Sequence, residues 1–241
     1  MRIVVFTDLH ANLPALQAVF GAIQAEGCDV IFHTGDAIGI GPYPSESLDL
    51  LLGEPKVECV MGNHDAYFVE GLPQPRPEWM SAGEAMHQRW THERLRSEQR
   101  SAMAAWPYVL KYEFEGVRTR FVHYGLTKLG RDFVPIEQQP SAEALDRILD
   151  GQNIELVFYG HHHGQSDQQG RTRYVNPGSL GCYQEAMARY CVVEFCRGEY
   201  EVKHRRVEYD DALLYKAFED RAVPEREFIY RVFFGGRFGG R

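Results

Sequence analysis

Five short apolar runs in this chain each end in polar side chains that can bind a metal ion or carry a proton. The runs are residues 3–6, 30–32, 57–61, 120–122 and 156–159. The first two flank a helical pattern, for which Asn12 is a good N-cap and Gly27 an end signal. A strand–helix–strand order implies parallel strands joined by a right-handed crossover. Because parallel strands end at the same edge of a sheet, we predict an α/β fold in which these polar side chains gather at one edge.

The side chains that follow the five runs are of types that bind transition metals. They are two carboxylates, one amide and four imidazoles: Asp8, Asp36, Asn63, His10, His123, His161 and His163. Imidazole mixed with oxygen ligands suits Mn, Fe, Co, Ni or Zn better than Mg or Ca, which prefer oxygen alone. Seven ligands exceed the coordination of one ion, so the set predicts two ions that share a carboxylate. His162 points to the opposite side of its segment and is not predicted as a ligand.

His64 and Asp65 are left over once these ligands are counted. Two ions about 3.5–4 Å apart can neutralise a phosphate ester, hold it for in-line attack and acidify a water to hydroxide. The departing alkoxide then needs a proton, for which His64 is the candidate donor, with Asp65 as its orienting residue. Each of these residues alone is also an ordinary loop or surface residue. Their joint occurrence at strand ends favours the metal site.

The strand–helix rhythm is interrupted between residues 67 and 107. Prolines at 73, 75 and 77 predict a non-helical linker, and the following stretch, rich in Ala, Glu, Arg and Gln, predicts helices that lie over the active edge. His87 and His92 in this helical insertion are predicted to be exposed helix residues rather than ligands. The tryptophans are interpreted as core anchors, with shaping of a substrate pocket as the alternative: Trp79, Trp90 and Trp106.

The second half of the chain shows mainly strand patterns. Strands are predicted at 108–115, 117–123 and 155–159, and residues 171–175, 190–196 and 200–209 alternate as strands of a second sheet. Helices are predicted near 141–150 and at 210–219. The glycine-rich tail 233–241 is predicted to be a flexible terminus, with anion binding as the alternative.

Composition excludes several classes of protein. The 241 residues suit one domain spanning 1–241, and a net charge of −8 argues against stable binding to a nucleic-acid backbone. No apolar run approaches the roughly 18 residues of a membrane span, and the N-terminus enters a strand without a signal-peptide pattern. Five cysteines without a Cys-x-x-Cys pair indicate buried, reduced thiols. We therefore expect a cytoplasmic protein without a membrane partner, and the oligomeric state stays open.

The ordered motifs resemble those of the calcineurin-like metallophosphoesterase superfamily. They are Asp8-x-His10, Gly35-Asp36, Gly62-Asn63-His64-Asp65, His123 and Gly160-His161-x-His163. The stretch from Gly35 to Pro44, the pair Trp90-Thr91 and the run from Asn176 to Gly181 resemble its small bacterial and archaeal phosphodiesterase-like branch. The resemblance implies a four-layer α/β/β/α sandwich of two mixed sheets, with a dinuclear site at the sheet edges.

The resemblance also implies a role for each residue of the motifs. Asp8, His10, Asp36 and His163 would hold one ion. Asp36, Asn63, His123 and His161 would hold the other, so that Asp36 bridges the two. His64 would be the proton donor and would also contact the phosphate.

Three departures from the family pattern bear on the substrate. Gly35-Asp36 is not followed by the Asp-Arg-Gly of the Ser/Thr protein phosphatases. Tyr124 separates His123 from Gly125, where relatives often have glycine directly. After Gly181 the chain continues with Cys182-Tyr183-Gln184 where relatives often carry Pro-Arg, so an arginine that faces the substrate is not expected here.

The sequence therefore predicts a phosphoesterase that depends on two divalent transition-metal ions. Manganese is favoured, and iron, zinc, nickel or cobalt are the alternatives. A phosphodiesterase that attacks a small or nucleotide-type phosphate ester with metal-activated hydroxide fits best. One alternative is phosphomonoesterase or Ser/Thr protein phosphatase activity at the same metals. Another is a non-catalytic metal-binding scaffold or sensor.

Overall fold

The computed structural model describes residues 1–149 and 151–238, and its first sheet is built around β1 (Arg2–Phe6). The strands follow the order β10 (Glu199–Glu208), β9 (Met187–Cys196), β1, β2 (Val30–His33), β3 (Val57–Cys59). β1, β2 and β3 are parallel, as predicted, and β9 and β10 are antiparallel additions. The placement of 190–196 and 200–209 in a second sheet was wrong, because β9 pairs directly with β1.

The second sheet holds the strands from the middle of the chain. Their order is β4 (Val109–Phe114), β5 (Val117–Val122), β6 (Leu156–Phe158), β8 (Arg173–Asn176), β7 (Ser166–Gln169). β5, β6 and β8 are parallel, whereas β4 and β7 pair antiparallel at the edges. β7 was not predicted, since its sequence Ser-Asp-Gln-Gln lacks apolar residues and only pairing with β8 makes it a strand.

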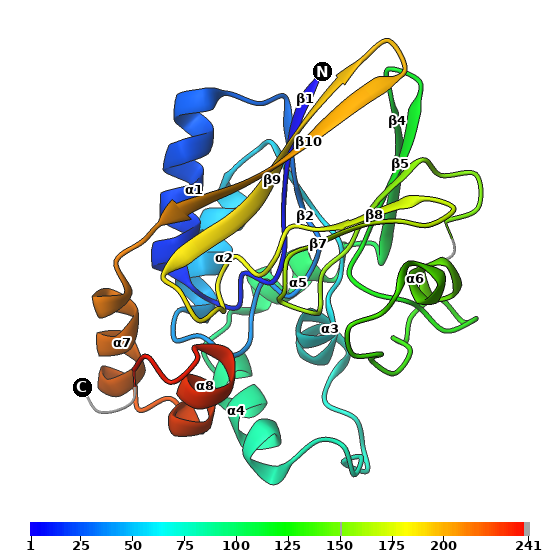
Figure 1. The fold of residues 1–241 in the computed structure, drawn as a ribbon. Helices are drawn as coiled ribbons and strands as arrows, with labels where there is room; N and C mark the ends of the chain where they lie inside the picture. The colour runs from blue at the N-terminus through cyan, green and yellow to red at the C-terminus, as the bar shows by residue number, and fades with distance from the viewer. Residues whose placement is uncertain (150, 239–241) are drawn as a thin grey trace.

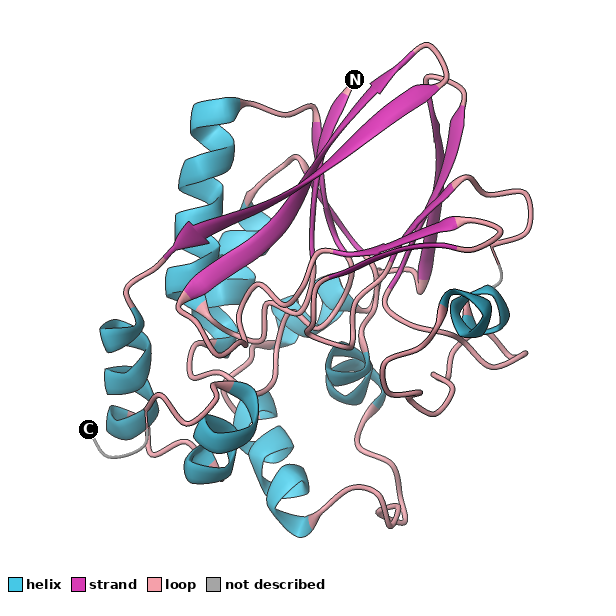
Figure 2. Ribbon diagram, viewed as in Figure 1, coloured by secondary structure: helices cyan, strands magenta, loops and turns pink. Residues whose placement is uncertain are grey.

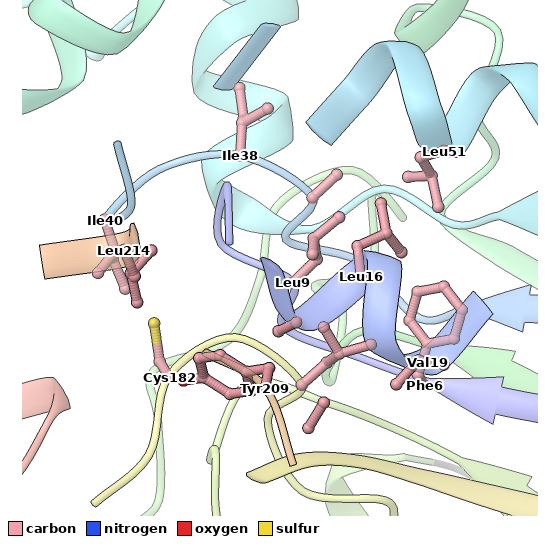
Figure 3. Close-up of a cluster of buried hydrophobic side chains, with 14 of the residues drawn as sticks. Phe6, Leu9, Leu16, Val19, Ile38, Ile40, Leu51, Cys182, Tyr209 and Leu214 are labelled. Carbon is pink, nitrogen blue, oxygen red and sulfur yellow. The ribbon is translucent and has the colours of Figure 1, made fainter. Parts of the chain in front are cut away.

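The two sheets pack face to face, and helices cover their outer faces (Figures 1 and 2). Ile3 and Val5 of β1 lie between the sheets, where the rings of Phe32 and Phe121 stack with centroids 3.8 Å apart. The alternate residues of β1 instead pack toward α1 (Leu13–Glu26) and α2 (Pro44–Gly53), in the core drawn in Figure 3. On the far side, α6 (Ala142–Ile148) covers the second sheet. The predicted four-layer α/β/β/α sandwich is confirmed. Residue 150, the end of the helix predicted at 141–150, lies outside the described residues.

The C-terminal part of the chain is packed rather than loose. After α7 (Asp211–Asp220), a second helix, α8 (Arg226–Phe233), was not predicted. Phe234 and Phe238 are buried against Phe218 and Tyr230, because aromatic residues at four-residue spacing bury enough apolar surface to offset the cost of ordering the backbone. The prediction of a flexible terminus is therefore wrong for 233–238. Residues 239–241 lie outside the described residues.

Segment 67–107 completes α3 (Asn63–Glu70) and contains α4 (Ala82–His92) and α5 (Ser97–Met103). His87 is only 5% exposed and its ring stacks on Trp90, so its predicted exposure is wrong. His92 is half-buried against Phe68. His87 is buried because the C-terminal segment covers one side of α4, where its Nδ1 contacts the Pro224 carbonyl, and the sequence pattern does not reveal this packing. Trp90 and Trp106 are core anchors, whereas Trp79 is 63% exposed.

Within residues 1–149 and 151–238, no helix has both the length and the apolar character needed to cross a bilayer. The five cysteines are all free thiols, and three of them are buried: Cys59, Cys182 and Cys191.

Candidate metal centre and active site

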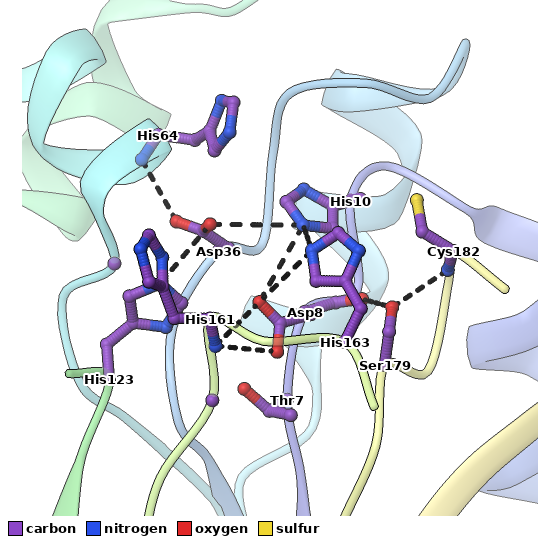
Figure 4. Close-up of polar contacts among 12 residues, drawn as sticks. Thr7, Asp8, His10, Asp36, His64, His123, His161, His163, Ser179 and Cys182 are labelled. Atoms are coloured by element: carbon purple, nitrogen blue, oxygen red, sulfur yellow. Dashed lines mark hydrogen bonds and ion pairs between the residues drawn. The ribbon is translucent and has the colours of Figure 1, made fainter. Parts of the chain in front are cut away.

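All seven residues predicted as ligands meet at the carboxyl ends of strands from both sheets, and Figure 4 labels all of them except Asn63. Asp8 and His10 follow β1, and Asp36 follows β2. Asn63 begins α3 after β3. His123 follows β5, and the His161–His163 segment follows β6. Backbone hydrogen bonds hold these loops together, as from the Asp8 N–H to the Gly35 carbonyl at 3.0 Å and from the Gly160 N–H to the His123 carbonyl at 2.9 Å.

One group of donors consists of Asp8, His10 and His163, whose ligand atoms lie within 4.8 Å of one another. The Nε2 atoms of His10 and His163 are 2.9 Å apart, and each lies 3.7 Å from Oδ1 of Asp8. Donor atoms that bind one ion at about 2.1 Å lie roughly 3.0–3.4 Å apart. The three side chains are thus close to the spacing of ligands around a single ion.

A second group consists of Asp36, His123 and His161. Nε2 of His123 lies 3.3 Å from Oδ2 of Asp36 and 3.1 Å from Oδ1 of Asn63, so the amide belongs to the same cluster. Oδ2 of Asp36 also lies 3.9 Å from Nε2 of His10. Asp36 therefore stands between the two groups, at the position of a shared carboxylate.

The ring orientation of two histidines fits metal binding. Nδ1 of His10 contacts the Ile38 carbonyl at 3.2 Å, and Nδ1 of His123 contacts the Thr34 carbonyl at 2.9 Å. A carbonyl oxygen accepts a hydrogen bond from Nδ1–H, so in the neutral ring the lone pair lies on Nε2, toward the donor cluster. The backbone thus selects the tautomer that a metal ion requires.

The charges of the buried groups also fit a cation. Burial lowers the pKa of His161 to about 3 and of His163 to about 4, and it lowers the pKa of His10 well below its usual value. These imidazoles are neutral near pH 7, which is the form that binds metal ions. Burial, together with the nearby Asp36 carboxylate, raises the pKa of Asp8 to about 7. A bound cation is the partner that would stabilise its carboxylate form.

His123 and Asp36 form a buried ion pair. Burial by itself disfavours the His123 cation, but the Asp36 carboxylate outweighs this effect and raises the pKa of His123 to about 9. Although burial alone raises the pKa of Asp36, the His123 and His64 charges hold it well below its usual range. A metal ion that binds His123 would replace this proton, because metal binding displaces protons from the ligands.

Five of the seven ligand candidates have left-handed backbone conformations. Their φ angles are 51° at Asp8, 47° at His10, 60° at Asp36, 73° at His161 and 57° at His163. Residues other than glycine seldom adopt such angles, and each costs about 1–3 kcal/mol. Strain concentrated at the residues that converge on one point is typical of a functional site.

Two glycines permit the close approach of these loops. A Cβ on Gly160 would lie 2.0 Å from Oγ1 of Thr7, and one on Gly62 would lie 2.2 Å from the Asp36 nitrogen. Real Cβ contacts are never this short, so a side chain at either position would push the ligand loops apart.

The carboxylate of Asp65 is bound to the backbone of the loop that follows β2. Its carboxylate accepts hydrogen bonds from four backbone N–H groups: Asp36 at 2.8 Å, Ala37 at 3.0 Å, Ile38 at 3.3 Å and Gly62 at 3.0 Å. The Asp65 carboxylate thus points toward the loop after β2, and the orienting role toward His64 stays a prediction. Asp65 ties that loop to the start of α3 and so fixes Asp36 beside His64.

We expect Asp65→Ala to destabilise the fold by about 3–5 kcal/mol, because it leaves several buried amides without an acceptor at roughly 1–3 kcal/mol each. For a chain of this size the melting temperature would fall by roughly 10 °C. Thermal unfolding of the metal-free protein measures this fall in melting temperature. Asp65→Asn is the milder variant, because it keeps one acceptor oxygen. An unchanged melting temperature together with lost activity would instead support the predicted role of Asp65 in orienting His64.

His64 lies in the first turn of α3, and its backbone N–H donates to Oδ1 of Asp36 at 2.9 Å. Its ring stands edge-on to the ring of His10, with centroids 5.2 Å apart. His64 also falls in a donor group with His10 and Asp36, so it reaches the same centre as the ligand candidates. His162, in contrast, lies outside the three groups, and its Nε2 contacts the Glu137 carbonyl at 2.9 Å.

Sequence reasoning missed the residues that support the ligands. Ser179 donates from its hydroxyl to the Asp8 carbonyl at 2.8 Å, and the Asn176 amide donates to the Gly160 carbonyl at 3.0 Å. Both belong to the Asn176–Gly181 run, for which the sequence showed a family resemblance but no functional role. Gln88 of α4 contacts Nδ1 of His64 at 2.6 Å and carried no signal except its place on a buried helix face.

Comparison with known proteins agrees with this geometry. The calcineurin-like phosphoesterase superfamily domain matches residues 1–198. An uncharacterized protein of Methanocaldococcus jannaschii is 26% identical over 243 residues, which cover 92% of this chain and 94% of that protein. A hypothetical protein from Pyrococcus horikoshii has a similar structure, with a TM-score of 0.79, 20% identity and 98% of both chains covered. A metallophosphoesterase from Sphaerobacter thermophilus has a TM-score of 0.69 and 23% identity, and the likeness covers 96% of this chain and 98% of that one.

The matched residues 1–198 include both donor groups and His64. The solved structures show the same fold over nearly the whole chain. Since the family model spans most of the sequence and its candidate metal ligands converge, the chain belongs to the calcineurin-like phosphoesterase superfamily, whose enzymes are metal-dependent hydrolases of phosphate esters.

Proposed function

We propose that this chain is a phosphodiesterase that uses two divalent metal ions to hydrolyse a small or nucleotide-type phosphate ester. The observation that carries the proposal is the pair of donor groups joined at Asp36, with the His64 imidazole beside them. Asp8, His10, Asp36 and His163 would hold one ion. Asp36, Asn63, His123 and His161 would hold the other.

Two divalent cations bound there supply positive charge for the phosphate oxygens and acidify a water for in-line attack. The chain's own residues do the rest. The ligand loops fix both donor groups at one sheet edge, and the ring of His64 stands over the same centre. Because Nδ1 of His64 is engaged by Gln88, the proton for the leaving oxygen is held at Nε2.

The charge around the site favours a diester over a monoester. A diester carries one negative charge at neutral pH, whereas a monoester carries nearly two. His10, His161 and His163 contribute neutral rings, and the Cys182-Tyr183 pair stands where relatives often carry an arginine. A site without a cationic side chain at residues 182 and 183 suits the monoanionic ester better than a dianionic one.

Hydrolysis of a bis-aryl phosphate by chelator-stripped protein tests the proposal, with Mn, Fe, Co, Ni and Zn added back one at a time. We expect two ions per chain and restored activity, with Mn the most effective metal. Faster hydrolysis of the mono-aryl ester would support the phosphomonoesterase instead. Two bound ions without turnover of either ester would support the non-catalytic scaffold.

An aromatic pair beside the site, the exposed Trp79 and the half-buried Tyr67, supports a nucleotide-type substrate. The ring of Trp79 stacks on Tyr67 with an interplanar angle of 28°, and the Tyr67 ring stands edge-on to His64 at 6.1 Å. The tyrosine thus links Trp79 to the candidate proton donor. A base stacked on an aromatic side chain gains about 1–3 kcal/mol, and the free face of Trp79 offers such a contact.

We therefore expect Trp79→Ala to raise KM for a nucleotide diester about tenfold, the equivalent of lost stacking. KM for a dialkyl phosphate should not change, since it has no ring to stack. Trp79→Phe is the matched variant, which keeps an aromatic face and should retain most of the binding. Equal effects on both esters would count against a base-stacking role for Trp79.

A further inference from the structure

The imidazole of His64 has a hydrogen-bonding partner from outside the family motifs. Gln88, in the middle of α4, is completely buried, and its Nε2 lies 2.6 Å from Nδ1 of His64. We infer that Gln88 positions the His64 ring for proton transfer, so that α4 is part of the catalytic apparatus. This inference rests on the proposed function of His64.

Among the contacts of the His64 ring, the hydrogen bond to Gln88 is the one that can fix the orientation of the ring. On one side, a Cβ on Gly39 would lie 2.5 Å from Nδ1 of His64, so the ring packs directly on the glycine backbone. His10 stands edge-on to the ring at 5.2 Å. Asp65, the next residue, contacts only backbone amides through its carboxylate among the hydrogen bonds of the described residues. Gln88 thus supplies a polar contact to the His64 ring, and the Asp65 carboxylate does not.

An amide is suited to this position because it can engage Nδ1 in either form. Its Nε2 donates to an unprotonated Nδ1, and after a half-turn its Oε1 accepts from a protonated Nδ1. Oε1 of Gln88 has no hydrogen-bond partner among the described residues, so the half-turn breaks no other contact of that oxygen. In both arrangements Nδ1 is occupied, which leaves Nε2 as the ring nitrogen available for proton transfer.

Helix α4 is itself held by the segment between α7 and α8. Nδ1 of His87 contacts the Pro224 carbonyl at 3.2 Å, and Gly83 packs so closely on Glu225 that a Cβ would lie 2.4 Å from its Cδ. The residues between α7 and α8 therefore brace the helix that carries Gln88. A positioning residue requires such support, since its effect depends on a fixed distance.

The experiment is a double-mutant cycle on a diester with an alkoxide leaving group, which needs a proton to depart. Gln88→Met keeps the volume of the side chain and removes the amide. We expect it to lower kcat about 10- to 100-fold, the range found for outer partners that orient a functional group, with little change in KM. In protein that already carries His64→Ala, Gln88→Met should have no further effect on kcat, because its action passes through the ring. Gln88→Glu, which can still accept from Nδ1, should restore most of the loss.

Gln99→Met is the matched control. Gln99 is also a buried glutamine of segment 67–107, at 2% exposure, but its amide contacts Ser45 and Asp49 rather than His64. This variant should lower the melting temperature and leave kcat unchanged. A crystal structure of metal-free Gln88→Met adds a readout independent of activity, in which the His64 ring is expected in a changed orientation.

The outcomes separate this inference from the proposed function. If the losses in Gln88→Met and His64→Ala multiply in the double variant, Gln88 acts elsewhere and the inference is overturned. Wild-type kcat in Gln88→Met, with His64→Ala inactive, overturns it as well and leaves the proposed function intact. Absence of activity in the wild-type protein with every metal overturns the proposed function, and the crystal structure then still tests the contact.

Discussion

Asp36→Asn is expected to reduce kcat on a bis-aryl phosphate by at least about 10³-fold, a larger loss on this ester than the one expected for His64→Ala. Asp36 stands between the two donor groups, and its Oδ2 lies 3.3 Å from Nε2 of His123 and 3.9 Å from Nε2 of His10. The amide removes the negative charge that both ions would share. Metal ions in such sites contribute several kcal/mol of charge stabilisation, and each 1.4 kcal/mol corresponds to a factor of ten in rate.

Metal content and turnover should be measured on the same preparation of Asp36→Asn. We expect the number of bound ions to fall from two to at most one per chain. Asp167→Asn is the control, since Asp167 forms an ion pair with Arg173 in the second sheet and lies outside the donor groups. Full metal content with normal turnover in Asp36→Asn would remove the shared carboxylate from the proposal.

His64→Ala is expected to have the second largest effect, and the effect should depend on the leaving group. Loss of a general acid costs about 10²- to 10⁴-fold where the leaving oxygen must be protonated. A dialkyl phosphate should therefore lose this factor in kcat, whereas a bis(nitrophenyl) ester, whose phenolate departs without a proton, should lose much less. KM should change little for either ester.

Metal content decides between the two roles that the geometry allows His64. Its ring belongs to a donor group with His10 and Asp36, so it is placed to bind an ion as well as to donate a proton. Two ions in His64→Ala support the acid, and a lower number would make His64 a ligand instead. His162→Ala is the matched control, because this histidine lies outside the donor groups.

The sequence was sufficient to predict the gathering of ligands because their positions follow from topology. Asp8, Asp36 and His123 each come directly after a parallel strand, and parallel strands end at a common edge. No knowledge of side-chain contacts was needed. The same reasoning failed for β9 and β10, because an antiparallel strand can join either sheet and only its actual pairing with β1 decides.

Gln88 could not be predicted for a different reason. It lies 24 residues from His64, beyond a proline-rich linker, and the sequence of this linker does not predict where the following helix packs. A polar residue between Ala85 and Trp90 on the buried side of α4 was the only sign of a partner. The burial of Phe234 and Phe238 likewise required the position of α7, since glycine-rich sequences normally indicate an irregular segment.

The left-handed backbone at Asp8, His10, Asp36, His161 and His163 has a consequence for evolution. Glycine at these positions would relieve the strain of the backbone, but it would remove the ligands. Selection for stability and selection for chemistry therefore act in opposite directions at the same five codons. In descendants that no longer need the reaction, drift should replace these residues by glycine or asparagine before it alters the surrounding core. Wherever a lineage keeps all five, it is still under selection for the chemistry of the site.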